Sequence, residues 1–340
     1  MDVLVLGGTV FLGRAVVSEA QALGADVTIF NRGTSAPPPP GVAQVIGDRT
    51  VAADLEQLAG RKFDVVVDTC GYVPADVARS AALLAPTCGH YAFVSSINVF
   101  PGWPEADDYH EGGVHQGDPG AIRGDVPAEL SASESYGWLK AGCELAAVRA
   151  FGADRTSVLR GGCIVGPHDS AVGRLPWWIA RVARGGEVLV PGAPNDPMSL
   201  IDARDLAAFA LSGAAGAFEA AGPPSRDTRG DLMAACRAAT GSDAQFTYVG
   251  DEWLVAQGVE AWTEVPLWVP EAPSVFAHDT AEAEAGGLTW RPLRDTVADT
   301  WAWQQSVPGG WQRNERTPGL APDREAQLLA AWHSQYRAEG

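Results

Sequence analysis

A glycine-rich turn between a strand-like run and a helical pattern opens the chain, and it constrains the fold more than any other feature. Asp2–Leu6 is a short apolar run typical of a buried parallel strand. Gly7–Gly13 reads Gly-Gly-Thr-Val-Phe-Leu-Gly, and Arg14–Leu23 carries apolar residues at helical spacing. Glycines let the backbone approach a pyrophosphate, whose charge a helix N-terminus favours. This order predicts a dinucleotide site, with an ordinary strand-to-helix turn as the alternative.

The first half of the chain goes on alternating apolar strands with helical segments. Further strands are expected at residues 26–30, 42–46, 64–68, 90–95 and 156–160. Such repeats form a parallel sheet with helices on both faces and ligands at the carboxyl ends of the strands. We therefore expect an α/β fold built on a Rossmann-type doubly wound sheet.

The pattern loosens after residue 160, which indicates a smaller C-terminal substrate-binding domain. We expect a dinucleotide-binding domain at 1–160, a substrate-binding region at 161–303 with some segments returning to the first domain, and a C-terminal extension at 304–340. Residues 101–132 are rich in Gly, Pro, Asp and Glu, and a loop of this length is usually functional or disordered. The extension contains an amphipathic helix that starts near Pro322.

Charge and composition narrow the classes of partner. The formal net charge is −18, and an acidic chain repels phosphate backbones, so nucleic-acid binding is disfavoured. No apolar run reaches the length of a membrane span, and Met1 is followed at once by the first strand, so we expect neither a membrane protein nor a signal peptide. Five cysteines without paired spacing indicate reduced thiols, a cytoplasmic location and no metal site.

The ends of the second and third strands bear on the adenosine half of a dinucleotide. An Asp or Glu after the second strand would accept hydrogen bonds from an NAD ribose, but Asn31 and Arg32 stand there. Arg32 could pair with a 2′-phosphate, which favours NADP(H) and leaves NAD(H) possible. Asp48 follows the third strand, where it could meet an adenine edge or cap the next helix.

Tyr136 and Lys140 stand four residues apart in a segment with helical character, so both side chains point the same way from adjacent turns. An unperturbed phenol has a pKa of about 10, and a nearby ammonium lowers that pKa by stabilising the phenolate. Such a pair could move a proton to or from a substrate oxygen. Taken alone, the same spacing also fits an ordinary surface pair.

With the glycine turn, Ser96, Tyr136 and Lys140 in this order, the chain resembles the extended short-chain dehydrogenase/reductase superfamily and, more narrowly, the NAD-dependent epimerase/dehydratase family. The resemblance covers roughly residues 1–303. It implies that Tyr136 is the acid-base, that Lys140 lowers its pKa and holds the nicotinamide ribose, and that Ser96 orients the substrate oxygen. Ser96 is preferred to Ser95 because Ser96–Phe100 is similar to the Ser-x-x-Val-Tyr run of the family.

The strand ends and the resemblance together define the predicted site, which contains no metal. Substrate contacts are expected from Asn98 and, in the second region, from His168, Trp177 and Trp178. A small-molecule substrate and a homodimer formed through helices beside the sheet are implied by the resemblance. The residues expected to bind the cofactor are Gly7, Thr9, Phe11, Leu12, Gly13, Asn31, Arg32, Asp48, Arg49, Thr69, Cys70, Gly71, Ser95, Tyr136, Lys140, Gly162, Cys163 and Ile164.

Three departures from the family pattern separate the possible functions. Val10 replaces the middle glycine of the turn, as in an atypical subgroup that includes chloroplast stem-loop RNA-binding proteins. Ile97-Asn98 stands where sugar-nucleotide 4,6-dehydratases have Asp-Glu, which disfavours that elimination, and Gly161 stands where a Pro is common. We expect an NAD(P)-dependent oxidoreductase acting on a carbonyl or hydroxyl carbon. The alternatives are a sugar-nucleotide epimerase that retains NAD and a non-catalytic NADP-sensing or RNA-associated protein.

Overall fold

The computed structural model describes residues 1–340 except 171, 224, 273, 310, 313–318 and 339–340. The chain divides into two compact units, each built from several segments. We call residues 1–164, 201–222 and 273–290 the sheet unit, and residues 165–200, 223–272 and 291–340 the C-terminal unit. No helix in the described part of the chain is long and apolar enough to cross a membrane.

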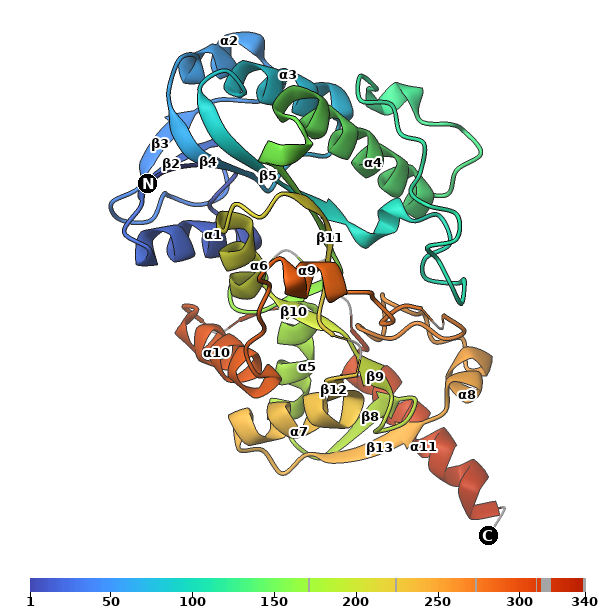
Figure 1. The fold of residues 1–340 in the computed structure, drawn as a ribbon. Coiled ribbons are helices and arrows are strands. Elements are labelled where there is room, and N and C mark those ends of the chain that lie inside the picture. The colour runs from blue at the N-terminus through green and yellow to red at the C-terminus, as the bar shows by residue number, and fades with distance from the viewer. Residues whose placement is uncertain (171, 224, 273, 310, 313–318, 339–340) are drawn as a thin grey trace. The chain divides into compact units, whose positions relative to one another are not determined.

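The sheet unit is built on seven parallel strands in the order β11-β6-β5-β4-β1-β2-β3 (Figure 1). From β1 the chain moves outward to β2 and β3 and then returns to β4 on the other side. The strand order therefore reverses between β1 and β4, the place where open α/β sheets bind ligands. The predicted Rossmann-type sheet is confirmed. Its strands are β1 (Asp2–Leu6), β2 (Asp26–Asn31), β3 (Ala43–Ile46), β4 (Phe63–Asp68), β5 (Cys88–Ser96), β6 (Thr156–Gly161) and β11 (Gly216–Ala220).

Helices cover both faces of this sheet because its central strands are apolar on both sides. Val3 and Val5 pack in one core cluster with α1 (Phe11–Ala22) and α6 (Ala203–Leu211). Leu4 and Leu6 pack in the opposite cluster with α3 (Pro74–Leu84) and α4 (Ala132–Phe151). The shorter helices of this unit are α2 (Ala52–Leu55) and α9 (Ala281–Ala285), and its 3-10 turns are η1 (Glu56–Leu58), η2 (Ile97–Val99), η3 (Arg123–Asp125) and η4 (Ala153–Arg155).

The C-terminal unit packs helices α5, α7 and α10 together beside short strands. Strand β8 pairs with β13 in parallel, and β9 pairs with β12 in antiparallel orientation. A buried ion pair between Arg181 and Glu325 (2.6 Å) fastens the last helix, α11. The elements are α5 (Arg174–Ala183), β8 (Glu187–Pro191), β9 (Pro197–Met198), β12 (Asp227–Thr228), α7 (Arg229–Thr240), β13 (Gln245–Val249), α8 (Asp251–Ala256), α10 (Leu293–Ser306) and α11 (Pro322–Ala338); β7 (Cys163–Val165) and β10 (Leu200–Asp202) lie where the chain passes between units.

The first helix begins earlier than the hydrophobic pattern predicts. It was expected from Arg14 but α1 begins at Phe11, directly after the glycine turn. Helix α4 begins at Ala132 because Ser131 accepts from the Glu134 amide while the Glu134 side chain accepts from the Ser131 amide. The same helix approaches its neighbours closely at Gly142, where an added Cβ would lie 2.6 Å from the Asp118 carbonyl oxygen.

Candidate active site

The glycine turn packs closely against its neighbours at the carboxyl end of β1. A Cβ at Gly7 would lie 2.6 Å from Thr69 Oγ1, and one at Gly13 would lie 2.7 Å from the Gly8 nitrogen. Gly7 and Gly8 also have φ of 110° and 95°, which L side chains rarely adopt. Val10, the residue before α1, has no side-chain acceptor for the first helical amides. Unshielded amides and glycine backbone at a helix start fit the pyrophosphate of a dinucleotide.

Asn31, at the end of β2, braces the glycine turn. Its Nδ2 donates to the Gly7 carbonyl oxygen (2.7 Å), and its Oδ1 accepts from the Gly33 amide (2.9 Å). The next residue, Arg32, is exposed and its side chain carries a charge beside the end of β3. Asp48 Oδ1 accepts from the Thr50 amide (2.9 Å) and hydroxyl (2.8 Å), and these bonds lower the pKa of Asp48. The Asp48 carboxylate thus closes the turn before α2.

Arg49, predicted to contact the cofactor, turns into the protein. Its guanidinium makes two bonds to the fully buried Asp68, Nη1 to Oδ1 at 2.8 Å and Nη2 to Oδ2 at 2.9 Å. Nη2 also donates to Ser80 Oγ (2.6 Å), and Tyr91 donates its hydroxyl proton to Asp68 Oδ2 (2.7 Å). Burial alone would raise the pKa of Asp68, but Arg49 holds that pKa below its usual value. Both terminal nitrogens of Arg49 are therefore engaged inside the sheet unit.

Helix α4 carries the predicted acid-base pair. The Tyr136 side chain is 36% exposed, whereas Lys140, one turn later, is only 3% exposed. Lys140 Nζ donates to the carbonyl oxygens of Gly71 (2.9 Å) and Val94 (2.6 Å) and lies 4.3 Å from the centre of the Phe93 ring. Burial lowers the pKa of Lys140. The helix thus holds an accessible phenol one turn before a fixed, buried amine, the spacing at which an ammonium can favour proton transfer by a tyrosine.

Ser96 ends β5 and lies on the turn that packs against the start of α4. Its Oγ donates to Asn98 Oδ1 (2.9 Å), and Asn98 Nδ2 donates to Ser133 Oγ (2.9 Å) on α4. A Cβ at Gly137 would overlap the Asn98 carbonyl oxygen, so only glycine lets the helix approach this turn. Ser95 instead donates to Glu144 Oε1 (2.5 Å) on α4. Ser95 is therefore bound to the interior of the sheet unit, whereas Ser96 lies on the turn that contains Asn98.

The segment after β6 is also closely packed. A Cβ at Gly162 would lie 2.9 Å from the Ala221 Cβ and 3.1 Å from His278 Nε2, and Cys163 is 5% exposed.

His278 belongs to a group of polar side chains that the sequence does not predict. In that group Tyr109 donates to Glu219 Oε2 (2.6 Å), and His110 Nε2 bonds Glu219 Oε1. Tyr109, Glu219 and His278 are too far apart in the chain for any spacing to relate them.

The other predicted substrate residues belong to the C-terminal unit. Trp178 is fully buried and donates its indole proton to the Pro266 carbonyl oxygen (2.8 Å), and Trp177 is 6% exposed. The His168 ring lies 5.4 Å from that of Trp303, centre to centre. The two tryptophans form part of the core of this unit, and their role toward a substrate stays a prediction.

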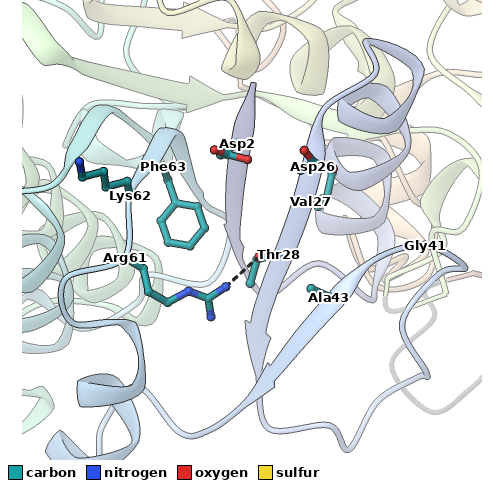
Figure 2. Close-up of a pocket in the computed structure, with 9 residues that line it drawn as sticks. All are labelled: Asp2, Asp26, Val27, Thr28, Gly41, Ala43, Arg61, Lys62 and Phe63. Carbon is teal, nitrogen blue, oxygen red and sulfur yellow. Dashed lines mark hydrogen bonds between the residues drawn. The ribbon is translucent and has the colours of Figure 1, made fainter.

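A pocket of about 410 Å³ lies at the amino ends of the strands, whereas the glycine turn lies at their carboxyl ends. Figure 2 shows it between the amino ends of the strands, with Asp2 at the start of β1, Asp26 at the start of β2 and Phe63 at the start of β4. The Arg61 guanidinium reaches across to Thr28 Oγ1 (3.4 Å). The pocket therefore does not belong to the site at the carboxyl ends. Among the described residues, no group of three or more His, Cys, Asp or Glu side chains could hold a metal ion.

The first part of the chain matches a known family, and its fold is similar to that of solved structures. Residues 3–89 match the model of the NAD dependent epimerase/dehydratase family, which confirms the predicted resemblance to extended short-chain dehydrogenase/reductase enzymes. The fold is similar to that of solved structures over about 90% of the chain. No protein of curated function matches the sequence.

Three of these structures illustrate the likeness. The Bordetella bronchiseptica enzyme WbmH in complex with NAD+ has 18% identity and a TM-score of 0.62, over 90% of this chain and 99% of WbmH. The Thermotoga maritima UDP-glucose 4-epimerase with UDP-glucose has 17% identity and a TM-score of 0.62, over 90% and 99%. The Bacillus cereus UDP-N-acetylglucosamine 4-epimerase has 14% identity and a TM-score of 0.60, over 91% and 98%.

Proposed function

We propose that this chain is an NAD(P)-dependent oxidoreductase that moves a hydride between the nicotinamide and a carbonyl or hydroxyl carbon of a small molecule. The observation that carries the proposal is the geometry of α4, where the exposed Tyr136 stands one turn before the buried Lys140. The Ser96 turn packs against the first turns of the same helix. The glycine turn supports the cofactor half of the proposal.

Each of the three side chains has one task in the reaction. The nicotinamide, when bound, supplies the position that accepts or donates hydride. Tyr136 takes the hydroxyl proton as the alcohol is oxidised, and it returns a proton to the carbonyl oxygen in the reverse direction. The Lys140 ammonium favours the phenolate form of Tyr136, so the proton can move near neutral pH. Ser96 orients the substrate oxygen by turning its hydroxyl proton from Asn98 Oδ1 to that oxygen.

NADP(H) is the proposed cofactor, and Arg32 is the reason. Its exposed guanidinium follows β2, where the 2′ position of the adenosine ribose lies in this fold. Arg49 cannot share this task because Asp68 and Ser80 engage its terminal nitrogens. NAD(H) remains the alternative, since WbmH was solved with NAD+.

A redox-neutral epimerase is the second candidate, and the solved structures favour it. Two of them are UDP-sugar 4-epimerases. A diphosphate needs cations, yet Arg160 pairs with Glu144 (2.9 Å) and Arg181 with Glu325 (2.6 Å). Their engagement leaves neither of these two arginines available for a diphosphate.

A cytoplasmic homodimer completes the proposal. All five cysteines are free thiols in the structure, which suits a reducing compartment. Leu145 of α4 is 42% exposed, an apolar position that a second copy of the chain could cover.

Two experiments test the proposal. The purified protein is denatured and the released nucleotide identified: stoichiometric NAD(H) would support the epimerase and contradict the role of Arg32, whereas an empty protein that binds NADPH more tightly than NADH supports the oxidoreductase. Activity is then screened with simple carbonyl compounds and UDP-glucose. Tyr136→Phe should lower kcat by at least about 100-fold, because general acid-base catalysis contributes that much. Tyr248→Phe, in the C-terminal unit, is the control, and full turnover by Tyr136→Phe would overturn the mechanism.

A further inference from the structure

The charge of Lys140 needs an explanation, because a buried ammonium tends to lose its proton. Lysine is rare in this chain: only Lys62 and Lys140 occur among 24 Lys and Arg residues. The two carbonyl oxygens that accept from Nζ carry no net charge, and burial lowers the pKa of Lys140. The proposed mechanism needs the ammonium form, so other charges must compensate for the lost solvation.

Two buried ion pairs lie near Lys140 in the sheet unit. Asp68, at the end of β4, pairs with Arg49 (2.8 Å), and its Oδ2 would lie 3.0 Å from a Cβ on Gly71, whose carbonyl oxygen accepts from Lys140 Nζ. Glu144 lies one helical turn after Lys140 on the same face of α4 and pairs with Arg160 of β6 (2.9 Å). The Asp68 side chain is 0% exposed and the Glu144 side chain 8% exposed, so water screens neither carboxylate well.

We propose that these two carboxylates, each held in place by its arginine, are positioning residues that keep Lys140 charged for its work on Tyr136. The inference rests on the proposed function, because it concerns the same acid-base pair. Each arginine fixes its carboxylate and also weakens the carboxylate's field. The charge balance of each pair therefore sets the pKa of Lys140. The carboxylate of a pair raises this pKa and the arginine lowers it.

The other titratable groups around Lys140 do not supply negative charge at neutral pH. Burial raises the pKa of the Cys143 thiol to about 12 and that of Cys70 to about 11, so both stay protonated. Tyr72 presents its ring to Nζ at 5.4 Å, and burial raises the pKa of its phenol. Tyr136 precedes Lys140 by one turn and is the group on which it acts. Asp68 and Glu144 are thus the carboxylates that oppose the effect of burial on the pKa of Lys140.

The rarity of lysine makes a direct measurement possible. The full chain is labelled with ¹³C-lysine, and the Cε signals of its two lysines are followed by NMR from about pH 7 to about pH 11, which spans the ordinary lysine pKa. Lys62 is exposed and serves as the internal reference. A Lys140→Arg variant assigns the signals. The readout requires no substrate, so its result does not depend on whether the screen finds an activity.

The Glu144–Arg160 pair is the one to change, because it is less enclosed than Asp68–Arg49. Glu144→Gln removes the negative charge and leaves Arg160 unbalanced, so the pKa of Lys140 should fall by about one unit. Arg160→Gln leaves Glu144 unbalanced, so the same pKa should rise. Leu145→Ala, on the exposed side of α4, is the matched control and should leave the pKa unchanged.

Opposite shifts for the two partners support the proposal, because a general loosening of the structure would move Lys140 in one direction in both variants. Shifts of the same sign, or no shift in either, would overturn it. If Glu144→Gln does not fold, Arg160→Gln and the milder Ser95→Ala, which removes one hydrogen bond to Glu144 without changing charge, still decide the matter. The pKa of Lys140 is then expected to rise in Arg160→Gln and to shift by no more than a small amount in Ser95→Ala. The nucleotide analysis and Tyr136→Phe judge the proposed function separately.

Discussion

The substitution Asp68→Asn probes the most deeply buried charge of the site. The Asp68 carboxylate is 0% exposed and accepts two bonds from Arg49 and one from Tyr91. An asparagine keeps the shape but leaves the buried Arg49 charge without its partner. Breaking a buried pair in this way costs about 3–5 kcal/mol, far more than an exposed pair would. That loss is a large part of the free energy of unfolding of a typical domain.

A second variant separates the pair from the single charge. Asp68→Asn combined with Arg49→Met removes both charges, and such replacement of a buried pair is often nearly neutral. The double variant should therefore recover most of the loss. The sign of the pH effect follows from the lowered pKa of Asp68: the stabilisation is present above the ordinary carboxyl pKa and is lost as pH falls through the folded-state value. The difference between the parent chain and Asp68→Asn should shrink in acid.

Native-state hydrogen exchange of peptides from β4 and β5 is the suitable assay, because it reports the local free energy of opening of the sheet unit separately from the C-terminal unit. The Asp68→Asn chain should lose protection in both strands, while peptides from β8 and β13 serve as the internal control. A loss below about 1 kcal/mol, or a double variant no more protected than the single one, would refute the reasoning.

Two further substitutions test the cofactor half of the site. Arg32→Glu should weaken NADPH binding at least about tenfold while sparing NADH, because a carboxylate repels the 2′-phosphate and accepts from a ribose hydroxyl; equal effects on both cofactors, measured by fluorescence titration, would argue against the role of Arg32. Gly13→Ala should abolish cofactor binding without unfolding the sheet, since its Cβ would lie 2.7 Å from the Gly8 nitrogen; normal affinity with an unchanged circular dichroism spectrum would contradict the assigned turn.

The central strands could be predicted because parallel strands are buried on both faces and appear as apolar runs. Strand β11 could not, since Gly216–Ala220 reads Gly-Ala-Phe-Glu-Ala and lacks the β-branched residues that mark a strand. Nor does the pattern show which later segments return to the sheet unit. Those segments are placed by tertiary packing, which leaves no periodic signal.

The site residues differ in the same way: those on one element can be related from the sequence, and those far apart in the chain cannot. Tyr136 and Lys140 could be related because one helix fixes their spacing. Asp68 and Arg49 lie far apart in the chain and no rule of spacing joins them, so their buried ion pair could not be predicted from the sequence. Whether Asn31, Asp48 and the other predicted residues touch the cofactor stays a prediction.

The glycines of α4 have a consequence for how the helix that carries Tyr136 is assembled. Gly137 and Gly142 each weaken an isolated helix by roughly 0.5–1 kcal/mol relative to alanine. In return, the helix lies directly against the Asn98 turn and the backbone at Asp118, both on the stretch of chain that precedes it. Part of the stability of α4 therefore comes from that stretch, in addition to the apolar residues that it buries against α3. A deletion within residues 101–132 would leave the strands of the sheet intact. It would remove the contact between Asp118 and α4, which helps to hold the helix that carries Tyr136.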